Sequence, residues 1–331
     1  MSEIAAIVEA LSRNRETPTV LATLVAVEGS SYRRPGARLL LLPDGTHLGS
    51  ISGGCLEEDL KEHARHVLAT GQPQTVVYDT TAENDLVWGV GLGCRGVVRI
   101  FVERLPASPP PWVETLRANR TRRCETALVV EHAGPAPRGT RLATELPGAE
   151  DAAGCFRETV PAPPALVVFG AGADAQPLVR FAKLLGWQVT VADARSAYAT
   201  AKRFPEADVL CVAPAAEQAA RLTFDERTFA VVMTHRYRDD LALLRTLLPA
   251  AVAYLGLLGP RQRTARLFAQ LATEGFVPDT GMLAKLHAPV GLDLGGGTPE
   301  TVALAIAAEM QARLAGRDGG SLRDRSGPIH G

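Results

Sequence analysis

The sequence lacks the features that mark secreted, membrane-bound or nucleic-acid-binding proteins. Its five cysteines are odd in number and form no C-x-x-C pair, so neither a disulfide framework nor a structural zinc site is expected. The formal net charge is −1 and no basic block is present, so we expect no nucleic-acid partner. Residues 1–16 carry Glu3 and Glu9 without a long apolar run, which argues against a signal peptide or membrane insertion and favours a cytoplasmic protein.

The length predicts about two domains, and the pattern of helices and strands along the chain predicts an α/β protein. Hydrophobic residues make up 46% and charged residues 21% of the 331 positions, enough for a sizeable buried core. A segment rich in proline, glycine and alanine separates two patterned regions. We predict an N-terminal α+β domain over residues 1–150, a linker over 151–164, a Rossmann-like domain over 165–315 and a flexible tail over 316–331.

Apolar periodicity predicts the elements of the first domain. Helices are expected over residues 3–15 and 56–70, the second ending at Gly71, and Pro43–Gly45 is expected to turn a β-hairpin. The proline-rich stretch 105–112 is expected to interrupt regular structure. Further strands are predicted over residues 19–31, 74–80, 96–105, 121–132 and 140–146.

The second domain shows the alternation typical of a doubly wound parallel sheet. A strand, a glycine-rich turn, a helix and another strand follow one another from Ala165 to Asp193. Gly170 and Gly172 fit G-x-G-x-x-A, in which the first glycine allows a tight turn and the second lets a phosphate approach the backbone. Asp174 places a negative charge in that turn, which caps the helix but repels a pyrophosphate. The pattern therefore favours the Rossmann fold more than NAD(P) itself, and a loop that only packs remains the alternative.

Two groups of histidines are candidate functional residues. His235 follows a buried strand, so it is expected at the carboxyl edge of the sheet with Asp239 and Asp240 near its ring; an ordinary loop residue is the alternative. His63 and His66 share a helix face with acidic residues at a spacing that could hold a metal. A solvated helix face is the favoured interpretation of that pair.

Arginines and cysteines mark three glycine-containing loops of the first domain. Arg33, Arg34 and Arg38 lie near two serines and could hold a phosphate or another oxyanion, although surface arginines are equally common. Cys55 follows Gly53-Gly54 and precedes a helix, and Cys94 lies in a second glycine-rich turn. Taken alone, a small buried thiol is the favoured interpretation of each cysteine.

Several motifs together resemble the XdhC/CoxI family over nearly the whole chain. They are "GSSYRRPGARLLL", "GSISGGCLEEDL" and "GLGCRG" in the first domain, and "MTHRYRDDL", "YLGLLGPRQR" and "APVGLDLGGGTPE" in the second. The resemblance implies a maturation factor without turnover of its own. Such a factor binds the molybdenum cofactor as cargo, supports its sulfuration with a cysteine desulfurase, and delivers it to a xanthine dehydrogenase-like molybdenum hydroxylase. It also implies a homodimer.

The resemblance assigns candidate cofactor-binding residues position by position. Cys55 and Glu57 match a G-G-C-x-E motif, and the resemblance makes Cys55 a candidate contact to molybdenum or sulfur. Two positions depart from the family pattern, Arg95 beside Cys94 and Pro260 after "LG". The resemblance also assigns Cys94, Gly170, Gly172, Asp174, Asp193, Arg195 and His235. Arg33 and Arg38, from the oxyanion argument above, are the candidates for the phosphate.

Two other functions remain open at this point. The Rossmann pattern is compatible with an NAD(P)-dependent oxidoreductase that uses His235 as acid or base, although no further catalytic group accompanies that histidine. Cys55 and Cys94 together are compatible with a redox-sensing protein. Binding of the molybdenum cofactor is the interpretation that accounts for most of the motifs.

Overall fold

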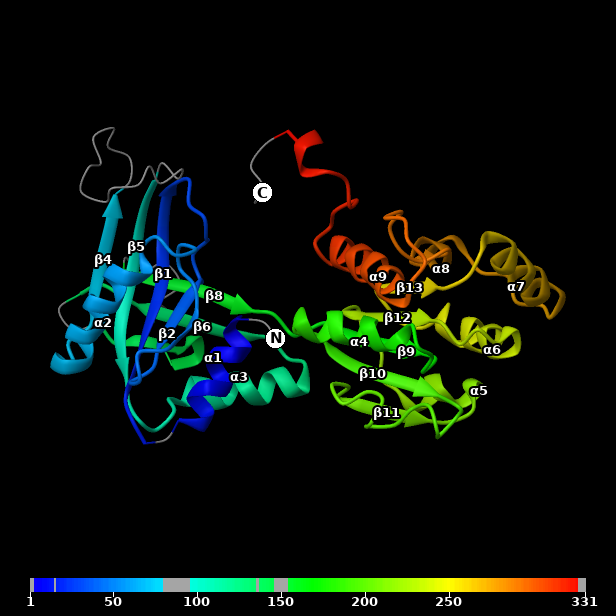
Figure 1. Cartoon of the computed structure of the whole chain (residues 1–331), viewed down its shortest axis with the longest axis horizontal. Helices are drawn as coiled ribbons and strands as arrows, with labels where there is room; N and C mark the ends of the chain where they lie inside the picture. The colour runs from blue at the N-terminus through cyan, green and yellow to red at the C-terminus, as the bar shows by residue number, and fades with distance from the viewer. Residues whose placement is uncertain (1–2, 15, 80–95, 135–136, 146–153, 327–331) are drawn as a thin grey trace. The chain divides into compact units, whose positions relative to one another are not determined.

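The computed structural model describes residues 3–14, 16–79, 96–134, 137–145 and 154–326. The chain divides into two compact units, residues 2–162 and 163–331, called here the N-terminal and C-terminal units. Each unit has its own sheet and helices (Figure 1). No helix in the described ranges is long and apolar enough to cross a membrane.

The N-terminal unit is built on an antiparallel sheet with strand order β3-β2-β1-β5-β4. Helix α2 (Glu57–Thr70) covers one face of this sheet, because Leu60, Ala64 and Val67 are buried on one side of the helix. Gly71 adopts a left-handed conformation and ends α2, as predicted. The strands are β1 (Thr19–Gly29), β2 (Arg38–Leu41), β3 (His47–Gly49), β4 (Gln74–Asp79) and β5 (Gly96–Leu105).

A second, three-stranded sheet completes this unit and corrects the predicted linker. Its order is β7-β6-β8, from β6 (Thr126–Glu131), β7 (Gly139–Leu142) and β8 (Cys155–Val160). Residues 155–160 therefore are not a linker, because their backbone pairs along β6. The compact unit continues to residue 162.

Two helices of the N-terminal unit, α1 (Glu3–Arg13) and α3 (Pro111–Arg122), share a second core. Helix α3 was not predicted, because its proline-rich start was interpreted only as an interruption. Proline is well suited to the first helical turn, where its missing N–H has no intrahelical partner, and Pro111 occupies that position. Trp112 and Leu116 of α3 pack with Ile7 and Leu11 of α1. A short 3₁₀ turn, η1 (Ala143–Glu145), follows β7.

The C-terminal unit is a parallel six-stranded sheet in the doubly wound order β11-β10-β9-β12-β13-β14. The chain winds outward from β9 in one direction and then from β12 in the other. Open α/β sheets bind ligands at the carboxyl ends of the strands where this reversal occurs. The strands are β9 (Ala165–Phe169), β10 (Gln188–Asp193), β11 (Val209–Val212), β12 (Thr228–Val232), β13 (Tyr254–Leu257) and β14 (Leu286–His287).

Helices cover both faces of the parallel sheet, which accounts for its nearly continuous apolar strands. One core includes residues of α4 (Ala175–Leu184) and α9 (Pro299–Leu314), and the other includes residues of α5 (Ala215–Gln218), α6 (Tyr237–Leu247) and α7 (Arg261–Thr273). Helix α9 begins with Thr298 as N-cap and a proline in its first turn. The remaining short elements are η3 (Ala219–Arg221), α8 (Thr280–Ala284) and η4 (Leu322–Asp324).

Candidate functional site

Residues 50–56, called here the thiol loop, connect β3 to α2 and carry Cys55. The loop is organised around one carboxylate, that of Glu57, whose two oxygens accept hydrogen bonds from both the backbone and side chains of the loop. Ser50 and Ser52 donate their hydroxyls to it. Four backbone N–H groups also donate to Glu57, at N···O distances of 2.9–3.2 Å: those of Ile51, Ser52, Gly54 and Leu56.

This arrangement keeps Glu57 ionised and fixes the conformation of the loop. Burial alone would raise the pKa of Glu57, but the hydrogen bonds from Ser52, Ser50 and Ile51 outweigh burial and lower its pKa to about 2. Gly53 and Gly54 have φ of 83° and 120°, backbone conformations that favour glycine. The result is a defined loop in which Cys55 is a free, solvent-exposed thiol two residues before α2.

The arginines expected to hold an oxyanion, in the connection between β1 and β2 and at the start of β2, already have other partners in part. Arg33 is paired with Glu3 at 2.8 Å, and the Arg38 side chain is only 2% exposed and paired with Glu158. Both guanidinium groups are thus paired with carboxylates of the same unit, so binding of a phosphate by Arg33 and Arg38 would require them to exchange these partners. Arg34 is exposed, and its side chain has no hydrogen-bond or ion-pair partner in the described part of the chain.

The structure offers no metal site at the predicted histidines. His63 Nδ1 lies 2.9 Å from the amide nitrogen of Gln74, and its Nε2 lies 3.4 Å from Asp59. Among the described residues, no group of three His, Cys, Asp or Glu side chains could hold a metal ion. Cys94 and Arg95 lie outside the described residues.

The glycine-rich turn of the C-terminal unit contains two glycines with different roles. The fold requires the first, and the second leaves space beside the backbone. Gly170 has φ of 117°, and a Cβ there would lie 2.5 Å from the carbonyl oxygen of Met233 at the end of β12. Gly172 is different, because the nearest atom to a Cβ placed there would be His235 Cδ2 at 3.9 Å. Only Gly172 therefore leaves room for a ligand to approach the turn.

The acid at the end of β10 is already engaged within the protein. Asp193 accepts hydrogen bonds from the Ala171 N–H at 2.7 Å and from the Arg195 backbone and guanidinium at 2.7–2.9 Å. Burial raises the pKa of Asp193, but the hydrogen bonds from Arg195 and Ala171 lower it overall. Both oxygens of the carboxylate that would bind a ribose diol in a dinucleotide-binding protein are thus occupied.

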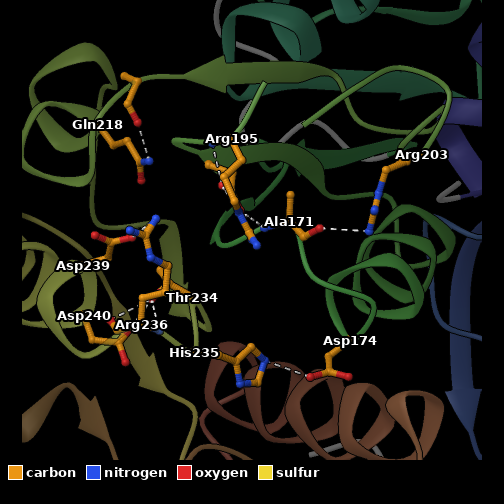
Figure 2. A network of polar contacts seen from close by, with 12 residues as sticks. Ala171, Asp174, Arg195, Arg203, Gln218, Thr234, His235, Arg236, Asp239 and Asp240 are labelled. Carbon is orange, nitrogen blue, oxygen red and sulfur yellow. Dashed lines mark hydrogen bonds and ion pairs between the residues drawn. The ribbon is translucent and has the colours of Figure 1, made fainter. Parts of the chain in front are cut away.

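Two basic residues support the same turn, and the sequence singled out only the first of them, Arg195. The second, Arg203, donates a hydrogen bond to the Ala171 carbonyl at 3.1 Å, and in Figure 2 the Ala171 backbone lies between Arg203 and Arg195. The guanidinium groups of Arg195 and Arg203 lie 3.8 and 4.8 Å from the ring centroid of Tyr198. No sequence motif marks Arg203, because its contact partner lies 32 positions earlier in the chain.

His235 lies at the carboxyl edge as predicted, but its partner is not one of the predicted acids. Its Nε2 lies 3.1 Å from Asp174, and Figure 2 shows the ring directed toward that carboxylate. Asp239 instead pairs with Arg236, and the buried Asp240 binds Thr234 and Arg263. The prediction that Asp239 and Asp240 orient the ring was therefore wrong.

The conformation of the His235 turn explains this exchange of partners. His235 has φ of 59°, an uncommon left-handed conformation for a residue other than glycine. Asp174, expected to cap α4, makes no capping hydrogen bond and faces the imidazole instead. The edge thus presents a pair formed by an exposed imidazole and a partly buried carboxylate, from the turns that follow β12 and β9.

These observations define a class of two-domain protein. Its N-terminal unit is α+β and carries an exposed cysteine on a fixed loop, and its C-terminal unit is Rossmann-like. The chain belongs to the XdhC and CoxI family. Residues 12–79 match the XdhC and CoxI family model, and residues 166–310 match that of the XdhC Rossmann domain.

Relatives support this membership along most of the chain. A protein of Bacillus subtilis (strain 168) named as a probable xanthine dehydrogenase subunit is 32% identical, covering 94% of this chain and 97% of that protein. The "Molybdenum cofactor insertion chaperone PaoD" of Escherichia coli is 25% identical, covering 88% and 82%. A crystal structure described as a xanthine dehydrogenase from Bacillus halodurans superposes with a TM-score of 0.82 at 30% identity, covering 97% and 98%.

Proposed function

We propose that this protein binds the molybdenum cofactor as cargo and delivers it to a xanthine dehydrogenase-like molybdenum hydroxylase. Two of its relatives carry names that point to this role: a molybdenum cofactor insertion chaperone and a xanthine dehydrogenase subunit. The observation that carries the proposal is the exposed Cys55 thiol on a loop fixed by Glu57. A cargo-binding thiol must be accessible, and a thiol that only filled space would be buried.

The chemistry of the cargo fits this loop. Thiolate sulfur is a soft ligand suited to molybdenum or to its sulfur ligand, so Cys55 is the proposed contact at the metal end. Glu57 does not bind the cargo in this scheme, because its oxygens are engaged by the loop. Arg34 replaces Arg33 and Arg38 as the candidate partner of the terminal phosphate, since its guanidinium is exposed.

Three finer features of the proposal rest on the family resemblance. The cargo receives its sulfur from a cysteine desulfurase while it is held by this protein, and the protein acts as a homodimer without independent turnover. Chemical cross-linking to a desulfurase and analytical ultracentrifugation of the purified chain test the first two of these features. A monomer at all concentrations would contradict the homodimer.

The main experiment reconstitutes an apo-hydroxylase with cofactor-loaded protein. Cys55→Ala should lower the recovered hydroxylase activity at least about tenfold, because the contact to the metal end is lost. Cys124→Ala is the matched control, since Cys124 is also a free, exposed cysteine of the N-terminal unit but lies at the end of α3. Equal activity with wild-type and Cys55→Ala protein would refute the role of the thiol.

An NAD(P)-dependent oxidoreductase remains the second candidate because of one observation, the Asp174–His235 pair at the ligand-binding edge of the sheet. Against it, Asp193 would have to exchange hydrogen bonds from Arg195 and Ala171 for those of a ribose. Calorimetric titration with NAD(H) and NADP(H) separates the two functions. Tight binding with hydride transfer would favour the oxidoreductase.

A further inference from the structure

Tyr32, in the connection between β1 and β2, is an exposed aromatic residue beside the thiol loop. Its side chain is 61% exposed. A Cβ placed on Gly53 would lie 3.0 Å from Cε1 of the Tyr32 ring and 3.2 Å from its Cδ1. The absence of a side chain at Gly53 therefore lets the ring lie directly against the backbone of the loop that carries Cys55.

The backbone that follows this contact is open at Gly54. A Cβ on Gly54 would meet no atom within 4 Å, and Cys55 is exposed. The Cα atoms of Gly53 and Cys55, two residues apart, are separated by at most about 7 Å. The contact between the Tyr32 ring and Gly53 and the exposed Cys55 therefore lie two residues apart on the same loop.

A single exposed tyrosine is ordinary on a protein surface, so its neighbours decide its significance. The other two exposed tyrosines of the described chain have partners. The face of Tyr198 is covered by the Arg195 guanidinium at 3.8 Å, and the Tyr237 hydroxyl donates a hydrogen bond to the Arg266 carbonyl. Tyr32 has no such hydrogen bond or ring contact with any described residue.

We infer that Tyr32 is the platform on which the pterin ring of the cargo stacks while Cys55 contacts the molybdenum end. This inference rests on the proposed function. Flat heteroaromatic rings stack on exposed aromatic side chains because both surfaces leave water and the two π-systems attract. Stacking also needs a ring of fixed position, and contact with the Gly53 backbone limits the motion of Tyr32. Tyr32 therefore gives the site a preference for ligands with a flat ring. The Cys55 thiol alone would not give that preference.

The test measures binding of molybdenum cofactor released anaerobically from a purified molybdenum hydroxylase to the full chain. Tyr32→Ala and Tyr32→Leu should both weaken binding about tenfold, the size typical of losing one base–aromatic stack. Tyr32→Phe should bind within about twofold of wild type, because it keeps the ring and loses only the hydroxyl. Leucine keeps apolar bulk, so it separates stacking from burial of apolar surface.

A fluorescence measurement reports stacking directly. In Tyr32→Trp the added indole should be quenched on titration with the same cofactor, after subtraction of the wild-type signal. The three native tryptophans, Trp88, Trp112 and Trp187, contribute to that background, and Trp112 and Trp187 are buried. If the fluorescence of Tyr32→Trp were quenched by the cofactor no more than that of the wild-type protein, the inference would be overturned.

The outcomes separate this inference from the function on which it rests. Loss of binding in Cys55→Ala with wild-type binding in Tyr32→Leu and Tyr32→Ala overturns the platform and leaves the proposed function standing. Wild-type binding in all of these variants overturns both. Loss of binding in Tyr32→Phe as well as Tyr32→Leu overturns stacking, because the hydroxyl would then be the group that matters.

Discussion

The two units each contain a glycine-containing loop tied to a carboxylate, but the carboxylates are compensated differently. Glu57 accepts hydrogen bonds from backbone N–H groups and serine hydroxyls of the thiol loop and makes no ion pair with a described residue. Asp193 accepts one hydrogen bond from the backbone N–H of Ala171, in the glycine-rich turn after β9, called here the Rossmann turn. Its other partner is Arg195. One loop is therefore organised by its acid, and the other mainly by its backbone.

The difference indicates what each loop can do. The Rossmann turn is fixed by close contact of Gly170 with the end of β12, so its acid adds support to a conformation already determined. The thiol loop has no comparable contact at Gly54, where a side chain would meet open space. Its conformation, and with it the position of Cys55, depends on Glu57. The loop thus leaves open space at Gly54 while its conformation is held by Glu57.

The largest expected effect is that of Glu57→Ala. The substitution removes the acceptor of several hydrogen bonds at once, so we expect a loss of about 4 kcal/mol in the free energy of unfolding of the N-terminal unit. Hydrogen–deuterium exchange measures this for each unit separately. The thiol loop should lose protection first.

Glu58→Ala is the matched control for this prediction. Its side chain is 82% exposed and pairs only with Lys61 among the described residues, so the free energy of unfolding should change by less than about 0.5 kcal/mol. Protection of peptides from the C-terminal unit should be unaffected by either variant. Equal protection of the thiol loop in Glu57→Ala and wild-type protein would show that the loop is not organised by its acid.

Sequence patterns predicted the fold of the C-terminal unit well, because each of its signals is local. The G-x-G-x-x-A turn and the Thr298 N-cap are both encoded within a few residues. The α/β fold with its N-terminal and Rossmann-like parts is confirmed by the structure and the family matches. Helix α3 and strand β8 were missed, since one begins in a proline run and the other is defined by pairing with a distant strand.

The site was less predictable, because ion pairs depend on tertiary contacts. Arg38 looked available in the sequence, yet Glu158, 120 positions away, neutralises it in the folded unit. His235 likewise found its partner 61 positions earlier, at Asp174. The positions of Cys55 and Glu57 at the start of a helix followed from the sequence, because acceptor and donors lie within a few residues of each other.

The second prediction compares Gly170→Ala with Gly172→Ala in the Rossmann turn. At Gly170 a positive φ and a contact of 2.5 Å with backbone oppose any side chain, so the C-terminal unit should lose about 3 kcal/mol of stability. At Gly172 a methyl group makes only ordinary contact with His235, so the change should stay within about 0.5 kcal/mol. Chemical denaturation followed by exchange in each unit measures both values. Similar losses for the two variants would contradict the distinction.

The smallest effect is a loss of stability in acid that each unit should show independently. In the C-terminal unit Glu309 is the counterpart of Glu57: burial raises its pKa, but hydrogen bonds from His287, Tyr254 and the Gly291 N–H lower it to about 2. The pKa of Glu57 is also lowered to about 2. In the unfolded chain the pKa of a glutamate is about 4.3. Between about pH 4.3 and about pH 2 the unfolded chain therefore binds more protons than the folded protein, and the free energy of unfolding falls as the pH falls through this interval.

At pH 3.5 each carboxylate should have lost about 1 kcal/mol of its contribution, and the loss should be absent above about pH 5. Glu57→Gln and Glu309→Gln cannot titrate at these positions. Each should therefore reduce the difference in unfolding free energy between pH 7 and pH 3.5 by about 1 kcal/mol, and only in its own unit. Exchange measured at both pH values, with rates corrected for intrinsic pH dependence, reports each unit separately. A smaller pH dependence of the unfolding free energy of the C-terminal unit in Glu57→Gln would contradict this prediction. The two carboxylates would then not act independently, because the stability of one unit in acid would depend on the loop of the other.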